Sequence, residues 1–174
     1  MGIRVPTLLY FVGVFGLIFG VQANRNNGLG IVLLFAFTGG LGLYLSAYLS
    51  LLMGVGMGSI IVKALVGTAI LFFGLSAYVL FSGVNFSFLG GFLYTGIMVA
   101  FLASIGGWVF GMSALSLASS AAFLLISSGY VLYNTSNIIQ GEETNYIMAT
   151  LQLFLDIFNI FISLLNLLSA FNRN

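Results

Sequence analysis

The sequence has no cysteine, no histidine and a single proline among its 174 residues. Without cysteine, the chain can form neither a disulfide nor a thiolate metal site. Without histidine, it lacks the commonest general base and the commonest metal ligand. Histidine-dependent hydrolysis and zinc sites built on cysteine or histidine are therefore excluded.

Charge is almost as scarce, since only 4% of the residues are charged while 61% are hydrophobic. A soluble domain carries about 25% charged residues, because its surface must interact with water. The 4 basic residues are scattered rather than clustered, so we expect no nucleic-acid partner. The composition predicts a protein whose surface faces the lipid bilayer, where every backbone polar group must be satisfied within a helix or a closed barrel.

The long hydrophobic runs decide between helices and a barrel. A barrel strand has about 10 residues of alternating polarity, whereas a spanning helix needs about 20 predominantly apolar ones. The runs here are long and do not alternate. We therefore expect an all-α, polytopic helical membrane bundle of about six transmembrane helices, forming a single transmembrane domain over 1–174. The expected helices cover residues 5–23, 29–53, 59–81, 88–110, 114–133 and 146–170.

One charged residue, Asp156, lies near the middle of the last run. A central aspartate costs roughly 2.5–3.5 kcal/mol on membrane-insertion scales. Such residues face a bundle interior or a water-filled cavity, and by default they mark a functional site. Asp156 is therefore a candidate group for binding a proton or a cation.

Polar residues recur at helical spacing on the last two runs, so that each run carries a polar stripe. Facing stripes can hydrogen-bond to each other or line a wet path between the helices. Packing is the favoured interpretation for the serines, because interhelical hydrogen bonds of this kind contribute about 0.6 kcal/mol each. For Asp156 function is favoured, because a carboxyl is a costly way to hold helices together. The stripes comprise Gln152, Asp156, Asn159, Ser163 and Asn166 on the last run, and Ser120, Ser127, Tyr130, Asn134 and Asn137 before it.

The residues needed for catalysis are missing, so we expect neither an enzyme nor a bound cofactor. Intramembrane aspartyl proteolysis needs two carboxylates, and the runs contain only Asp156. Serine proteolysis needs a base, for which Lys63 near a helix end is the sole candidate. Glu142 and Glu143 have two interpretations: solvated loop charges, or an acidic mouth that attracts cations.

Two C-terminal stretches carry a family resemblance: ISSGYVLYNTSNIIQGEETNY (126–146) and LFLDIFNIFISLL (153–165). With FAFTG (35–39) and SFLGG (87–91), they resemble the Bax inhibitor family, and within it the bacterial YccA-like branch. The resemblance implies a bundle in the bacterial inner membrane, with the last helix in the centre. Because family members have seven helices, it also implies that the family's usual first helix is absent here.

The resemblance implies two functions of different classes. Family members studied as channels are calcium leaks, gated by protons through one aspartate in each of the last two helices. The matching positions here are Asn134 and Asp156, so only one carboxylate is present, and such a pair cannot share a proton as two carboxylates do. We expect a passive cation leak in which calcium is the permeating ion and protons act on the carboxyl of Asp156 in the last helix. The alternative is modulation of the membrane-bound, ATP-dependent protease FtsH without transport.

Membrane orientation has two opposed predictions. Six spans place both ends on one side, and counting basic residues puts Arg4, Lys63 and Arg173 in the cytoplasm and the loop at 134–145 outside. The family resemblance implies a cytoplasmic location for that loop. Both orientations stay open at this point.

Overall fold

The computed structural model describes residues 4–172, with side chains described from Val12 onward. Arg173 and the side chain of Arg4, which entered the orientation prediction, lie outside the described part. All regular structure in that range is helical. Its elements are α1 (Arg4–Ala23), α2 (Gly28–Gly54), α3 (Gly58–Ser82), the 3₁₀ turn η1 (Ser87–Leu89), α4 (Gly90–Phe110), α5 (Ser113–Gln140) and α6 (Tyr146–Asn172).

These helices have the length and the composition needed to cross a bilayer. Within the described residues, 5 helices are long and apolar enough to span it, and Val12–Ala23 of α1 forms a shorter apolar helix. A helix of 25 residues such as α3 is about 38 Å long, which exceeds the ~30 Å hydrocarbon core. The predicted all-α, polytopic membrane bundle is confirmed.

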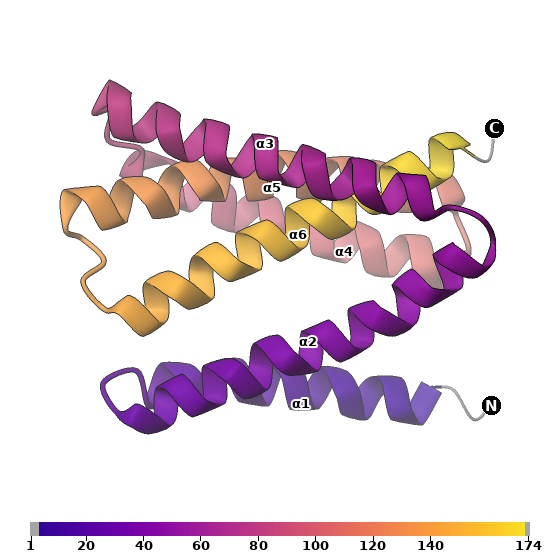
Figure 1. The fold of residues 1–174 in the computed structure, drawn as a ribbon, viewed down its shortest axis with the longest axis horizontal. Helices are drawn as coiled ribbons and strands as arrows, with labels where there is room; N and C mark the ends of the chain where they lie inside the picture. Colours follow the sequence, from indigo (N-terminus) through magenta and orange to yellow (C-terminus); the bar gives the residue numbers. More distant parts are fainter. Residues whose placement is uncertain (1–3, 173–174) are drawn as a thin grey trace. The chain divides into compact units, whose positions relative to one another are not determined.

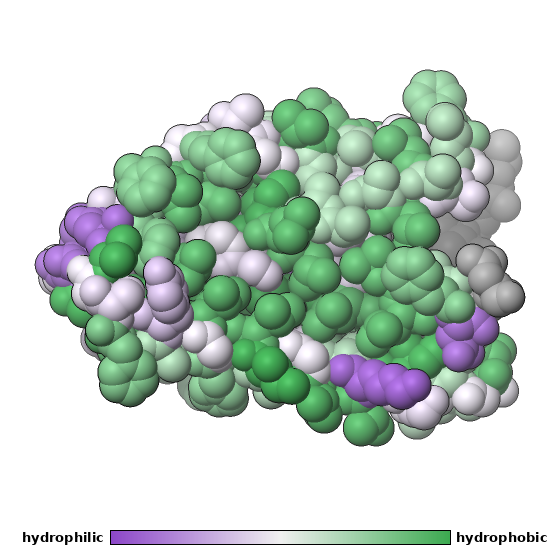
Figure 2. All heavy atoms as spheres, turned by 90° about the horizontal axis from the view of Figure 1, so that it is seen from above, coloured by the Kyte–Doolittle hydropathy of each residue, from purple (hydrophilic) through white to green (hydrophobic). Residues whose placement is uncertain are grey.

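Large apolar side chains on the outside of the helices support the same conclusion. Phe81 is 90% exposed and Leu43 is 77% exposed. Figure 2 shows a face covered mostly by hydrophobic side chains, with few hydrophilic ones. Apolar patches of this extent are rare on soluble monomers, but they are the expected surface against lipid.

The chain divides into two compact units. Unit 1 contains the residues up to Val55 together with Asn145–Leu151, and within it α1 packs against α2. Unit 2 contains Gly56–Thr144 and the chain from Gln152 onward, and within it α5 packs against both α3 and α4 (Figure 1). Helix α6 therefore begins in unit 1 and continues through unit 2.

In unit 1, Asn145 ties the start of α6 to the connection between α1 and α2. Its Nδ2 donates to the backbone carbonyl of Arg25 at 2.9 Å and to the Asn26 side chain at 3.0 Å. Its Oδ1 accepts the backbone N–H of Met148 at 3.0 Å, which is the hydrogen bond of a helix N-cap. One amide side chain thus holds a helix start and a loop together.

Helix α6 is covered along most of its length, as expected for a central last helix. No residue from Leu151 to Ala170 is exposed. The side chains of Ile160 and Leu165 have no exposed surface at all. This coverage is what allows α6 to carry polar residues away from lipid.

The predicted end of the fifth helix at residue 133 is wrong, because α5 continues to Gln140. Polar residues after Tyr133 suggested a loop, but their side chains are used inside the bundle. The Ser136 hydroxyl accepts the backbone N–H of Phe86 at 2.9 Å. The chain turns at Gly141, whose φ of 76° is the left-handed conformation that favours glycine.

A second glycine lets α4 and α5 approach closely. A Cβ atom added at Gly107 would lie 3.0 Å from the backbone nitrogen of Ser116. The two backbones are therefore in contact near the turn between these helices, which is how small residues bring membrane helices together.

Candidate functional site

The candidate site centres on Asp156, which hydrogen-bonds to Asn134. The Nδ2 of Asn134 donates to the Oδ2 of Asp156 over 2.7 Å. Both residues are 5% exposed. A hydrogen bond this short to a carboxylate oxygen is typical of a charge-assisted interaction. The polar stripes thus meet at this hydrogen bond, six residues before the end of α5 and ten residues after the start of α6.

A cavity of about 250 Å³ adjoins this hydrogen bond in unit 2. Four predicted stripe residues line this cavity together with Asp156. Gln152 and Asn159 belong to α6, and Tyr130 and Asn134 belong to α5. It is large enough to hold several water molecules, and its polar groups can bind them. The full lining is Ile97, Tyr130, Tyr133, Asn134, Gln152, Leu155, Asp156 and Asn159.

The two glutamates of the short connection before α6 differ in position. Gln152 lines the cavity, and its Nε2 donates to Oε2 of Glu143 at 3.5 Å. Glu143 is half-buried, whereas Glu142 is exposed. The backbone N–H groups of both glutamates cap the end of α5 by donating to the carbonyl of Asn137, at 2.8 Å from Glu142 and 3.1 Å from Glu143. Of the predicted acidic mouth, only Glu143 contacts a residue that lines the cavity.

Other predicted stripe residues lie outside the cavity lining. Ser127 is 1% exposed and Ser163 is 4% exposed. Asn137 and Asn166 are half-buried. Three buried polar atoms have no hydrogen-bond partner among the described residues: Ser127 Oγ, Asn137 Oδ1 and Ser169 Oγ.

Some lining residues escaped the sequence analysis. Tyr133 follows Tyr130 by one helical turn, and its ring lies 6.2 Å from that of Tyr130, centroid to centroid. The stripe spacing on α5 could have revealed it. Ile97 gives no such signal, because it is one apolar residue among many on α4. Ser169 continues the α6 stripe three residues beyond Asn166, so periodicity could have included it.

The chemistry available at this site is that of one carboxyl group with neutral polar neighbours. Asn134 can serve both protonation states of Asp156, since its amide donates to a carboxylate and, after rotation, accepts from a carboxylic acid. Calcium prefers 6–8 oxygen ligands. Within the described residues there is no group of 3 or more acidic residues that could hold a metal ion. The site therefore offers one carboxyl group surrounded by neutral groups that can form hydrogen bonds.

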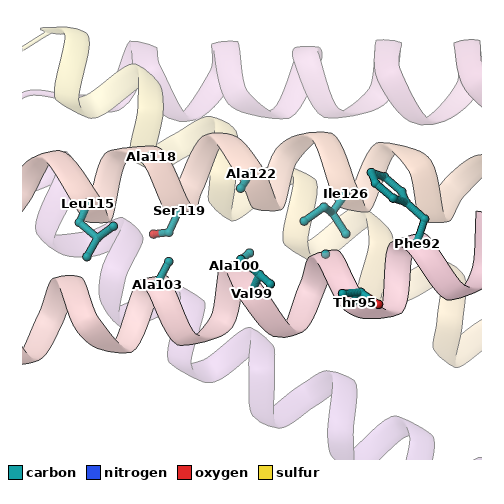
Figure 3. A pocket seen from close by; sticks show the side chains of 11 residues that line it. Phe92, Thr95, Val99, Ala100, Ala103, Leu115, Ala118, Ser119, Ala122 and Ile126 are labelled. Atoms are coloured by element: carbon teal, nitrogen blue, oxygen red, sulfur yellow. The ribbon is translucent and has the colours of Figure 1, made fainter.

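A larger cavity lies elsewhere in unit 2, between α4 and α5 (Figure 3). It measures about 500 Å³ and its lining is apolar except for Thr95 and Ser119. Both hydroxyls donate to backbone carbonyls of their own helices, at 2.9 Å and 2.8 Å. Both of its hydroxyl groups are thus already bonded, and the smaller cavity beside Asp156 is the candidate site.

Comparison with known proteins identifies the family. Residues 1–173 match the family described as "Inhibitor of apoptosis-promoting Bax1". The chain belongs to the Bax inhibitor family. It is 47% identical over 167 residues to the "Modulator of FtsH protease YccA" of Escherichia coli, an alignment that covers 96% of this chain and 76% of that protein.

Two further relatives extend this membership to other bacteria. An uncharacterised protein of Pseudomonas aeruginosa is 46% identical over 168 residues, covering 94% of this chain and 76% of the relative. An uncharacterised membrane protein of Vibrio cholerae is 36% identical over 172 residues, covering 98% and 77%. YccA of a second E. coli strain is described as an inner membrane protein. With its apolar helices, the chain is an integral protein of the inner membrane, as predicted.

Proposed function

We propose that this Bax inhibitor family protein modulates the membrane protease FtsH. The observation that carries the proposal is its 47% identity, over 96% of the chain, to a protein described as a modulator of that protease. Similarity over nearly the whole chain is what a shared partner surface requires. The protein would act by binding, with no catalysis of its own.

The outer faces of the helices support a partner of this kind. In unit 2, exposed side chains such as Phe73 (69%), Phe92 (73%) and Trp108 (73%) cover α3 and α4. In a bilayer these faces meet lipid or the transmembrane helices of another protein. Asp156 lies inside and contributes nothing to them, so modulation should be independent of that carboxyl.

The test is the FtsH-dependent degradation rate of a membrane substrate, measured in proteoliposomes with and without this protein. We expect a change in rate and co-purification of the two proteins from mild detergent. Asp156→Asn serves as the matched control variant, and it should modulate as the unmodified protein does. An unchanged degradation rate, with both proteins shown to be folded in one membrane, would contradict the proposal.

A second candidate function is a passive cation leak through unit 2. It is favoured by one observation, a carboxyl that is only 5% exposed beside a cavity of about 250 Å³. Intramembrane carboxyls mark ion or proton pathways. Calcium and protons are the candidate ions, and Asp156 with Asn134 is the proposed binding site.

Flux into proteoliposomes tests this second candidate. An ion leak through the site should disappear in Asp156→Asn, which keeps the size and the hydrogen-bonding ability of the side chain but removes its charge. If flux persists unchanged in that variant, the ions do not pass through this site. The degradation and flux assays thus give opposite expectations for the same substitution.

A further inference from the structure

Helices α4 and α5 touch at two levels and leave a gap between them. At one level the backbones of Gly107 and Ser116 meet, as described above. At the other, Leu93 packs onto Gly129, where an added Cβ would lie 2.6 Å from a leucine methyl carbon. Leu93 and Gly107 are fourteen residues apart, which is about 21 Å along α4. The apolar cavity of about 500 Å³ lies in the interval between the two contacts (Figure 3).

Small side chains on both helices produce this gap. Figure 3 shows Ala103 and Ser119 pointing toward each other from opposite sides of it. Ala100 and Ser119 are only 2% and 4% exposed, so they form the floor of the cavity. The small lining residues are Gly96, Ala100 and Ala103 on α4, and Ala118, Ser119 and Ala122 on α5.

The cavity is continuous with the surface that meets the bilayer. Phe92 and Val99 line it, and they are 73% and 62% exposed. In an integral membrane protein, exposed apolar side chains of this kind on a spanning helix contact the hydrocarbon of the lipids. With a buried floor and exposed rims, the cavity is a groove that opens onto lipid.

Neither water nor empty space suits this groove. The hydroxyl groups of Thr95 and Ser119 already donate to backbone carbonyls, and the other lining side chains are apolar. A bound water molecule needs 2–4 polar partners, which the groove does not offer. An empty groove would leave its lining atoms without partners for dispersion contacts. The occupant is therefore apolar and comes from the membrane.

The size of the groove selects an acyl chain over a helix. From Phe92 to Ala103 it extends for eleven residues of α4, which is about 16 Å. One leaflet of the bilayer has about 15 Å of hydrocarbon, half of the ~30 Å core, so a lipid chain matches this length. A helix about 10 Å wide takes up roughly 1,200 Å³ over 16 Å. That is more than twice the volume of about 500 Å³.

We propose that the groove between α4 and α5 binds one acyl chain of a membrane phospholipid. The lining carries no charged residue, in keeping with an uncharged ligand. A chain in the groove contacts two helices at once, whereas a lipid on an outer face contacts one, so the bound lipid exchanges more slowly. The site is separate from the Asp156 cavity, and the proposal is independent of both candidate functions.

The test is native mass spectrometry of the whole chain, reconstituted with phosphatidylethanolamine and phosphatidylglycerol and then washed in mild detergent. We expect one phospholipid to stay bound to the unmodified protein. Ala103→Leu and Ala122→Leu each fill part of the groove and should lower the retained fraction about tenfold, equivalent to displacing roughly two methylene groups. Ala69→Leu is the matched control, because Ala69 is exposed on α3 and does not line the groove.

Three outcomes would overturn the proposal. The first is an unmodified protein that retains no phospholipid after the wash. The second is equal retention in Ala103→Leu, Ala122→Leu and the control, which would place the lipid elsewhere. The third is a dimer without lipid that Ala122→Leu dissociates, which would make a second copy of the chain the occupant. Helix content and gel filtration establish that each variant is folded.

Photocrosslinking tests the site without any substitution. The probe is a phosphatidylethanolamine with a diazirine in its acyl chain, bound to the unmodified protein and washed in the same way. Adducts should concentrate on residues 92–103 and 115–126, the two segments that line the groove. Adducts spread evenly over other exposed side chains, such as Phe73 of α3, would overturn the proposal.

Discussion

The Asn134–Asp156 hydrogen bond predicts a measurable coupling energy between two membrane helices. The perturbation is a double-mutant cycle in which Asn134→Ala and Asp156→Ala are made singly and together. The cycle removes the 2.7 Å contact while cancelling the other effects of each truncation. Its result is the energy of the pair itself.

The magnitude follows from two competing estimates. A hydrogen bond to a charged group contributes about 1.5–3 kcal/mol in soluble proteins. Interhelical hydrogen bonds in membrane proteins average only about 0.6 kcal/mol, with a maximum near 1.7. Because the contact is short and both residues are 5% exposed, we expect about 1.5 kcal/mol, near the top of the membrane range.

The assay is reversible unfolding in mixed micelles, with a second pair in the same unit as control. Ser76 of α3 and Thr135 of α5 form a neutral hydroxyl–hydroxyl contact at 3.4 Å. Thr135 adjoins Asn134 in the chain, so the two pairs share depth and helix. We expect the control coupling to stay below about 0.5 kcal/mol, as for a weak neutral bond.

The reasoning would be refuted by a coupling no larger than that of the control pair. That result would mean that the carboxylate is as well satisfied without Asn134 as with it. A further expectation concerns pH: once Asp156 is protonated, the pair becomes a neutral hydrogen bond, and the coupling should fall toward about 0.6 kcal/mol.

Three other predictions follow from packing and composition. Gly107→Ala should lower the unfolding temperature, because its Cβ would lie 3.0 Å from the Ser116 backbone. Gly91→Ala on the same helix would place a Cβ with nothing within 4 Å, so this control should be neutral or stabilising. Thermal melts of both variants check this prediction. Asn145→Ala should destabilise the start of α6 by about 1 kcal/mol, the usual cost of losing an N-cap, and amide hydrogen exchange near Met148 should speed up. A chelator such as EDTA should leave the melting temperature unchanged, because no group of 3 or more metal-binding side chains exists among the described residues.

The helical membrane fold was predictable because it depends on local properties. Run length and the scarcity of charge require spanning helices, whatever their order in space. The boundary at residue 133 failed for a non-local reason. Ser136 looks like a loop residue, but it accepts a hydrogen bond from Phe86, which lies fifty residues earlier in the chain. Tertiary contacts overrode the local preference.

Part of the candidate site was predictable for the same reason. Asp156 stands out because a charge is expensive anywhere in a bilayer. Gln152 and Asn159 follow from helical periodicity, which fixes the side of α6 on which they lie. Ile97 could not be found, since nothing in its local sequence distinguishes it from the other apolar residues of α4.

By itself, the sequence determined that this protein spans the membrane, belongs among Bax inhibitor proteins and carries one costly carboxyl on a polar stripe. These features depend on composition, spacing and similarity, all of which are properties of the chain. Only the tertiary structure decided that Asn134 meets Asp156 at 2.7 Å, that Tyr133 lines the cavity and that Ser127 is buried without a protein partner among the described residues. The physical reason is that such contacts depend on the rotation and register of packed helices, which many side chains set together and no local stretch encodes.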